Sequence, residues 1–351
     1  MKRASLLLVC PGYSSFVNTD IQILSEQWKV IVNAFPWRRQ YLVPWFFLRQ
    51  IIFLFRHAWS CKAILISSGG YWALMPSFAG RLLGKPVYII LNGADCASIR
   101  SLNYGSLRKF MVRKVCWLSY RLATRLLPVS ASLIRVKNLY NPVDGETDQG
   151  YEVFFPNLKT PATVMYNGLD GDYWFADPSE QKADNTFISV FAASQFYLKG
   201  GDLIVDLARR LPHCEFRIAG MQKPQFISDI PGNLGFLGYL EPEELRHYYR
   251  ISRFHFQLSV FEGFGCSLCE AMLCECIPIV SSVNMLPEII DDTGFVVSRR
   301  ELKELLGCVE EALQTQNKEA LGKNARRRVM GHYSISHRNA AFTELLQGGT
   351  S

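Results

Sequence analysis

The 351-residue sequence lacks the features of disulfide-rich, secreted and membrane-spanning proteins. Its ten cysteines are too sparse for a disulfide scaffold, and most lie inside apolar runs, as Cys269 does in SLCEAM, where reduced thiols pack as small hydrophobes. Only five consecutive apolar residues precede Pro11, so we expect a buried strand there instead of a secretory signal. No stretch reaches about 18 uncharged apolar residues, because Arg49 and Arg56 interrupt the best candidate, and no membrane-spanning helix is expected.

Disorder and solenoid repeats are excluded as well. Hydrophobic residues make up 49% of the chain and charged residues 20%, which is the balance of a folded globular protein. No internal repeat at a solenoid period is visible in the sequence. The chain is longer than one domain usually is, so two domains are expected.

Positive charge is concentrated in the first half of the chain. Residues 1–150 contain 19 Lys and Arg against 6 Asp and Glu, whereas the remaining residues contain 19 against 25. The net charge of +7 therefore combines a strongly basic first half with a mildly acidic second half. Such asymmetry indicates that the first half meets an anionic surface, either phospholipid or nucleic acid.

Strand and helix patterns alternate along both halves. In the second half we expect strands at 186–194, 215–220, 233–240, 254–260 and 277–282, and helices at 202–211, from 241 onward and at 266–275. In the first half we expect strands at 5–10, 28–35, 63–68, 86–92 and 125–130. This alternation predicts an α/β fold of two Rossmann-like, doubly wound domains that face a central cleft. We place the domains at 1–163 and 164–325, and expect 326–351 to form a helix that packs back towards the first domain.

Residues 262–270 form the segment that carries the most chemistry. This segment reads EGFGCSLCE, follows a strand and opens a helix, so backbone can approach a ligand there and helix amides can face an anion. Glu262 and Glu270 frame it and can face one cleft. Other interpretations stay open. Gly263 and Gly265 are only the beginning of a dinucleotide fingerprint, Glu262 fits a solvated loop acid, and Ser267 with Glu270 matches a capping box.

Short motifs on both sides of this segment carry a family resemblance. In order they are Glu262, Glu270-Ala271-Met272, Pro278-Ile279-Val280, Pro287-Glu288-Ile289 and Gly294-Phe295-Val296. Together they closely resemble the donor-binding segment of retaining nucleotide-sugar glycosyltransferases of family 4, which have the GT-B fold. Upstream, Leu198-Lys199-Gly200 and Tyr166-Asn167-Gly168 resemble further steps of that family, and Pro11-Gly12 and Gly93-Ala94-Asp95 resemble it more faintly. The resemblance is strong over about residues 164–297, and it implies that the first domain binds the acceptor and the second binds the donor.

The resemblance implies a role for each matching residue. Lys199 and the helix after Gly265 would stabilise the negative charge that develops on the leaving nucleoside diphosphate. Glu262 would bind hydroxyls of the donor sugar, so Lys199 and Glu262 are the expected catalytic residues. Glu270 would accept hydrogen bonds from the ribose hydroxyls. The expected donor-binding set is Gly12, Gly263, Phe264, Gly265, Cys266, Ser267 and Glu270. A surface lysine before a Gly-Gly turn is the alternative for Lys199.

Two positions depart from the family pattern. Ser194 stands where the family usually has an arginine that assists on the phosphates. Asn92 stands where many members have a histidine near the reacting sugar, and an amide cannot act as a general base. On the acceptor side, Asn92 and Asp95 are the expected residues, although Asp95 equally fits a cap of the helix that follows.

No metal and no other cofactor is expected. Asp170-Gly171-Asp172 has the shape of the manganese motif of the other major glycosyltransferase fold, but it lies in a turn at the domain junction. Cys266, Cys269, Cys274 and Cys276 lie on one helix, where their sulfurs cannot converge tetrahedrally on zinc, so packed thiols are favoured. The six histidines show no H-x3-H spacing.

The composition of residues 37–59 indicates where in the cell the protein is expected to act. This stretch contains three Trp, four Phe and four Arg, a mixture that suits a lipid interface, although a core helix with outward-reaching arginines is the alternative. The expected partners are a nucleotide-sugar donor, a glycan or lipid-linked acceptor and an anionic membrane surface, but not nucleic acid. We therefore expect a cytoplasmic protein that is peripheral on the inner face of the cell membrane.

The function expected from these features is sugar transfer in the synthesis of cell-surface polysaccharide or lipopolysaccharide. Two alternative functions remain open. A sugar-nucleotide 2-epimerase has the same architecture, but it would need carboxylates and histidines in the first half that this chain does not offer. A non-catalytic protein that binds lipid or nucleic acid would fit the basic first half and the two departures.

Overall fold

The structure is a computed structural model that describes residues 3–37, 39–141 and 147–348. The chain divides into two compact units. Unit 1 comprises 1–137, 148–168 and 335–351, and unit 2 comprises 138–147 and 169–334. The units differ from the predicted domains in three respects. Residues 138–147 belong to unit 2, residues 164–168 belong to unit 1, and the last segment of unit 1 begins at 335 instead of 326. Position 326 lies inside one continuous helix, which is why the chain does not pass from one unit to the other there.

Unit 1 contains a five-stranded parallel sheet in the order β2-β1-β3-β4-β5. Its strands are β1 (Ser5–Cys10), β2 (Lys29–Ala34), β3 (Cys61–Ser67), β4 (Val87–Leu91) and β5 (Arg125–Pro128). Its helices are α1 (Ser15–Gln27), α2 (Val43–His57), α3 (Tyr71–Leu83), α4 (Phe110–Leu122), α5 (Tyr151–Phe154) and α12 (Ile335–Gly348). A two-stranded antiparallel ribbon, β6 (Val136–Lys137) with β7 (Asp148–Gln149), completes the unit.

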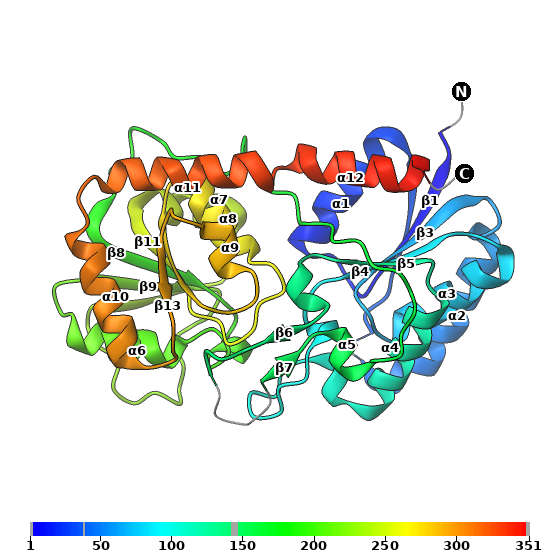
Figure 1. Ribbon diagram of the computed structural model, residues 1–351, viewed down its shortest axis with the longest axis horizontal. Helices are drawn as coiled ribbons and strands as arrows, with labels where there is room; N and C mark the ends of the chain where they lie inside the picture. The colour runs from blue at the N-terminus through cyan, green and yellow to red at the C-terminus, as the bar shows by residue number, and fades with distance from the viewer. Residues whose placement is uncertain (1–2, 38, 142–146, 349–351) are drawn as a thin grey trace. The chain divides into compact units, whose positions relative to one another are not determined.

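The helices of unit 1 cover both faces of its sheet. Figure 1 shows α1 and α12 on one face and α2, α3 and α4 on the other. The central strands are therefore buried on both sides, and Leu6–Cys10 and Ile64–Ile66 are almost completely inaccessible. This explains why the sequence of these strands is a continuous apolar run and does not alternate with polar residues.

Unit 2 contains a six-stranded parallel sheet in the order β10-β9-β8-β11-β12-β13. Its strands are β8 (Ala183–Val190), β9 (Glu215–Ala219), β10 (Leu234–Gly238), β11 (Ser252–Gln257), β12 (Ile277–Ser281) and β13 (Phe295–Val297). Its helices are α6 (Gly201–Arg210), α7 (Pro242–Ile251), α8 (Cys266–Leu273), α9 (Leu286–Ile290), α10 (Leu302–Gln314) and α11 (Lys318–His332).

The core of unit 2 contains a stack of aromatic rings between its sheet and helices. The ring of Phe187 lies 5.0 Å from that of Phe216 and 4.8 Å from that of Phe254, all three nearly parallel. In Figure 1, α6 and α10 cover one face of the sheet, and α7, α8, α9 and α11 cover the other. The prediction of an α/β fold with two Rossmann-like domains is confirmed.

Candidate active site

The strand order of unit 2 reverses between β8 and β11. The chain proceeds outward from β8 to β9 and β10, then crosses back to β11 and continues to β12 and β13 on the other side. In open α/β sheets, ligands bind outside the carboxyl ends of the strands at such a reversal point. Lys199 follows β8 and Glu262 follows β11, so the fold brings both predicted catalytic residues to this point.

Lys199 and Glu262 form an ion pair. The Lys199 Nζ atom lies 2.5 Å from Glu262 Oε2, and the two side chains are only 12% and 14% exposed. Ser259 Oγ donates to the same carboxylate oxygen at 3.0 Å, and Gln257 Nε2 donates to it at 2.5 Å. Burial alone would raise the pKa of Glu262, but the charge of Lys199 and these hydrogen bonds outweigh burial and lower it. Glu262 is therefore ionised at neutral pH, and it can bind hydroxyls or balance charge but cannot act as an acid.

Close backbone packing holds together the loop that follows β8 and the loop that follows β11. Gly200 has φ +73°, and a Cβ atom there would lie 2.7 Å from Leu258 Cβ and 2.9 Å from the Leu258 carbonyl oxygen. The Val260 amide donates to the Leu198 carbonyl at 2.8 Å. Because only glycine fits both the conformation and the space, the position of Lys199 depends on Gly200.

The helix α8 begins directly after the glycines of the segment. Gly265 is its N-cap residue with φ +112°, which side-chain-bearing residues rarely adopt. Gly263, Phe264 and Cys266 lie at this turn, and Ser267 is the second helical residue. The Ser267 hydroxyl donates to Gln257 Oε1 at 3.1 Å, so Gln257 connects the start of α8 to Glu262. The expected anion-binding end of this helix is thus tied to the Lys199–Glu262 pair.

Glu270 lies in the middle of α8 and is half-buried. Within the described residues, no hydrogen bond or ion pair reaches its carboxylate, and burial raises its pKa to about 7. Its charge and that of Glu262 both act on the Cys269 thiol, whose pKa is raised mainly by burial, so the two carboxylates lie in one neighbourhood. The capping-box alternative is wrong, because Gly265 precedes the helix and no side chain caps it.

The predicted residues of unit 1 lie at the carboxyl ends of its strands. Gly12 follows β1, and the space where a Cβ atom would lie is open. Asp95 is 1% exposed, and its carboxylate accepts the backbone N–H groups of Gly69 at 2.7 Å, Gly93 at 2.9 Å and Asn92 at 3.1 Å. Burial raises the pKa of Asp95, while these bonds act in the opposite direction. Asp95 therefore holds the ends of β3 and β4 together, and an acceptor could reach its carboxylate only if these bonds opened.

Asn92 has a free acceptor atom. Its Nδ2 atom donates to the hydroxyl of Ser68 at 2.9 Å, and its Oδ1 atom is buried without a hydrogen-bond partner in the described part of the chain. An unpaired buried carbonyl oxygen is costly, so a ligand hydroxyl that donated to it would be stabilised.

The geometry of unit 2 agrees with a sequence comparison. Residues 172–328 match the family model of "Glycosyl transferases group 1". We call this matched part of the chain the group 1 domain, after the family to which it is similar. It coincides with most of unit 2 and includes Lys199, Glu262 and Glu270.

Similarity in sequence to a characterised protein covers about a quarter of this chain, whereas similarity in fold to solved structures covers almost all of it. The O-antigen chain mannosyltransferase B of Escherichia coli is 32% identical over 83 residues, which span 24% of this chain and 22% of that protein. Sucrose-phosphate synthase from Thermosynechococcus elongatus superimposes with a TM-score of 0.75 at 16% identity, covering 99% of both chains. Anabaena Alr3699/HepE, solved in complex with UDP and glucose, superimposes with a TM-score of 0.71 at 14% identity, covering 98% of this chain and 100% of that one. The fold is therefore GT-B.

Sequence reasoning missed three polar residues of the group 1 domain. Gln257 and Ser259 bind Glu262, and Asn284 Oδ1 accepts the Glu262 backbone N–H at 3.0 Å. The alternation of Arg253, His255, Gln257 and Ser259 with apolar residues was the available signal. In a central strand of a parallel sheet, such alternation is unusual and indicates a buried polar network.

The group 1 domain has no assembled metal ligands among its described residues, and the same holds for the described part of unit 1. The Asp170 carboxylate accepts the backbone N–H groups of Asp172 and Tyr173, both at 3.0 Å, so this motif forms a hydrogen-bonded turn. Cys269, Cys274 and Cys276 are buried free thiols, and Cys266 is half-buried.

Proposed function

We propose that this protein is a retaining, metal-independent glycosyltransferase of family 4. It transfers a hexosyl group from a nucleotide-sugar donor to a glycan or lipid-linked acceptor. The observation that carries the proposal is the largely buried Lys199–Glu262 pair at the strand-order reversal of the group 1 domain, linked through Gln257 to the start of α8. The named complexes of HepE with UDP and with UDP-glucose support a nucleotide-sugar donor.

The leaving group determines what the site must do. When the bond between the sugar and the diphosphate breaks, negative charge grows on the phosphate oxygens. Lys199 supplies a fixed positive charge in a poorly hydrated position, and the start of α8 presents the positive end of a helix dipole. Glu262 holds the Lys199 ammonium in place and accepts hydrogen bonds from sugar hydroxyls.

The acceptor proton requires no protein base in this proposal. Asn92 stands where many members of the family that the chain resembles have a histidine, and an amide does not take up a proton at neutral pH. With retention, an oxygen of the departing phosphate can take the proton of the acceptor hydroxyl on the same face of the sugar. Asn92 Oδ1 then serves as a hydrogen-bond acceptor that orients a hydroxyl.

A panel of nucleotide sugars tests this proposal. We expect transfer or slow hydrolysis of one donor, at equal rates with and without EDTA, and a product that keeps the anomeric configuration of the donor sugar. NMR of the product reads the configuration directly. A requirement for manganese or an inverted linkage would contradict the proposal, and so would failure of every donor with a folded protein.

We further propose that the acceptor is lipid-linked and that the protein works at the inner membrane surface in polysaccharide or lipopolysaccharide synthesis. The name of the Escherichia coli relative, an O-antigen chain mannosyltransferase, supports this pathway class. None of the helices formed by the described residues has the length and apolarity that a bilayer crossing requires. The helix α2 buries Phe46, Gln50 and Leu54 along one side, while Trp45, Arg49 and Arg56 are exposed on it. Arg38, at the start of this stretch, lies outside the described residues.

We expect the protein to sediment with anionic vesicles, to ignore neutral ones and to be released by salt. Each basic residue near an anionic surface contributes about 1 kcal/mol, and the surface field decays within about 8 Å at physiological salt. Replacing Arg49 and Arg56 by serine should weaken sedimentation by about tenfold or more without changing nucleotide affinity. Equal sedimentation of the double variant and the wild type would contradict attachment through α2.

The affinity for a nucleoside diphosphate should rise with pH through neutrality. If ribose hydroxyls donate to Glu270, binding favours its ionised form, whose population grows about tenfold between pH 6 and pH 8 for a pKa of about 7. The neighbouring Tyr249, Cys269 and Cys274 do not titrate in this range, because burial raises the pKa of each. In the absence of ligand, ionising Glu270 destabilises the fold as pH rises from about 4.5 to 7, because its folded-state pKa lies above its ordinary value.

Calorimetry with UDP at the two pH values measures this effect, and Glu270→Gln is the matched control. The variant keeps a hydrogen-bond acceptor but cannot titrate, so the remaining pH dependence is that of the diphosphate itself. We also expect Glu270→Ala to weaken UDP binding by about tenfold or more. An identical pH dependence in Glu270→Gln and the wild type would show that Glu270 does not bind the ribose.

A further inference from the structure

An apolar groove lies between α2 and α3 on the face of unit 1 that those helices cover. Its volume is about 350 Å³, within the range of small-molecule sites. Every residue that lines it is apolar, and the principal ones are Ile51, Phe55, Trp59, Met75, Phe78 and Leu82. A site for a water-soluble ligand would need a few polar groups to orient it, and this groove offers none.

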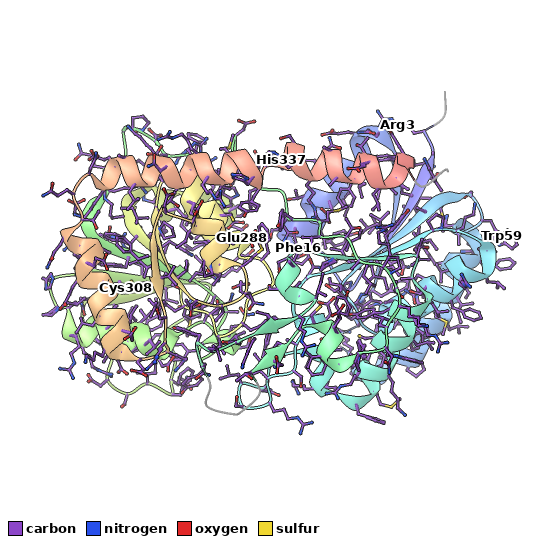
Figure 2. The ribbon with its side chains drawn as sticks, in the orientation of Figure 1. Arg3, Phe16, Trp59, Glu288, Cys308 and His337 are labelled. Carbon is purple, nitrogen blue, oxygen red and sulfur yellow. The ribbon has the colours of Figure 1, made fainter. Side chains whose placement is uncertain are left out.

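Large side chains stand open to solvent along this groove. Phe55 is 76% exposed, Leu82 74%, Trp59 64% and Phe78 57%. Figure 2 shows Trp59 at the outer rim of unit 1, with its side chain directed away from the sheet. Single exposed apolar residues are ordinary, whereas a contiguous set around a hollow marks a binding surface.

The charged residues of the two helices that form the groove are all basic. Residues 27–143 contain 17 Lys and Arg but a single acidic residue, Asp95, which is buried. Arg49 and Arg56 on α2 and Arg81 on α3 are exposed, and in the described part of the chain they make no ion pair. An apolar hollow between two helices whose charged residues are all arginines is complementary to a lipid that joins a hydrocarbon chain to an anionic headgroup.

We propose that the α2–α3 groove takes one acyl chain of an anionic membrane lipid while the flanking arginines contact its phosphate. The inference deepens the membrane attachment proposed above and rests on it. A chain seated in the groove would remove Phe55, Phe78 and Leu82 from water and place Trp59 at the depth of the acyl chains. Attachment would then be directional, because a groove accepts a chain only along its length, whereas charge alone would leave the protein free to rotate on the surface.

Fluorescence quenching tests the position of Trp59. The full-length protein is mixed with phosphatidylglycerol and phosphatidylcholine vesicles whose acyl chains carry bromine, which quenches tryptophan on contact. We expect quenching in the wild type, and Trp59→Phe should lose most of it. Because the chain has seven tryptophans, the difference between these two proteins isolates the signal of Trp59.

A variant whose groove is filled by a larger side chain distinguishes binding of a lipid chain in the groove from nonspecific hydrophobic adsorption to the membrane. Ala79 also lines the hollow, so Ala79→Phe adds apolar surface but occupies the space of the chain. We expect Ala79→Phe to bind these vesicles about tenfold more weakly, although it is the more hydrophobic protein. Phe78→Ser should weaken binding similarly. Phe226→Ser is the matched control, because Phe226 in unit 2 is 58% exposed, nearly the same as Phe78, and should leave binding unchanged.

The outcomes discriminate between the two proposals. If the wild type binds anionic vesicles, Trp59 is not quenched and Ala79→Phe binds normally with an unchanged melting temperature, the groove proposal is overturned and membrane attachment stands. If the wild type ignores the vesicles, both are overturned, while donor hydrolysis in solution still tests the transferase. If the wild type is a dimer in sedimentation velocity and Ala79→Phe is a monomer, the occupant is a second copy and the lipid proposal fails.

Discussion

Lys199→Ala is expected to lower turnover by about 10²- to 10³-fold while UDP affinity falls much less. A fixed charge aimed at a developing anion typically contributes this much, because its effect is greater in the transition state than in the ground state. Glu270 would still hold the ribose, so ground-state binding loses only part of its contacts. Steady-state rates with the preferred donor and calorimetry with UDP measure the two effects separately.

The Lys199→Ala experiment needs a control that separates loss of stability from loss of catalysis. Removing Lys199 leaves the carboxylate of Glu262 nearly buried without its cation, which by itself destabilises the loop. The double variant Lys199→Ala with Glu262→Gln removes both charges and should regain the melting temperature but not the turnover. If this double variant recovered turnover, Lys199 would act only by neutralising Glu262, and its catalytic role would be refuted.

Asp20→Ala is expected to destabilise unit 1 by about 3–5 kcal/mol, or about 10 °C in melting temperature. Asp20 on α1 pairs with Arg338 on α12 through bonds of 2.5 Å and 2.8 Å, and the two side chains are 2% and 1% exposed. Arg338 also donates to the carbonyls of Met165 and Tyr166 at 3.1 Å and 2.7 Å. Without Asp20, a buried guanidinium would lack its counter-charge, and α12 would lose its main polar attachment to α1.

Glu26→Ala is the matched control for this prediction. Glu26 lies on α1 and accepts a bond from Asn339 of α12 at 3.1 Å, but at the exposed edge of the same helix pair. Its loss should change stability by no more than about 0.5 kcal/mol, since exposed polar contacts contribute little. Thermal unfolding followed by circular dichroism compares the two variants. Equal melting temperatures of the two variants would show that the buried Asp20–Arg338 pair contributes no more to stability than the exposed contact between Glu26 and Asn339.

Much of the fold follows from local sequence patterns. The apolar runs at Ser5–Cys10 and Ile277–Ser281 form strands where they were expected, because a central parallel strand must be apolar on both faces. The helix after Gly265 begins where the glycines and the preceding strand predict it. Such features depend on residues a few positions apart, which is why periodicity and turn residues are sufficient to predict them. The short strand β13, by contrast, contains only three residues and has too little pattern of its own.

The sequence by itself determined which residue types could perform the chemistry, namely a lysine and two glutamates around a glycine turn. Only the tertiary structure decided their states. Lys199 pairs with Glu262 across 63 positions, and the Asp95 carboxylate accepts backbone N–H groups. Among the described residues, the Glu270 carboxylate has no hydrogen-bond or ion-pair partner. Likewise, the end of the chain joins unit 1 through Asp20 and Arg338, 318 positions apart. The physical reason is that burial and ion pairing depend on which distant segments the sheets bring together. Local sequence patterns do not predict these contacts between residues far apart in the chain.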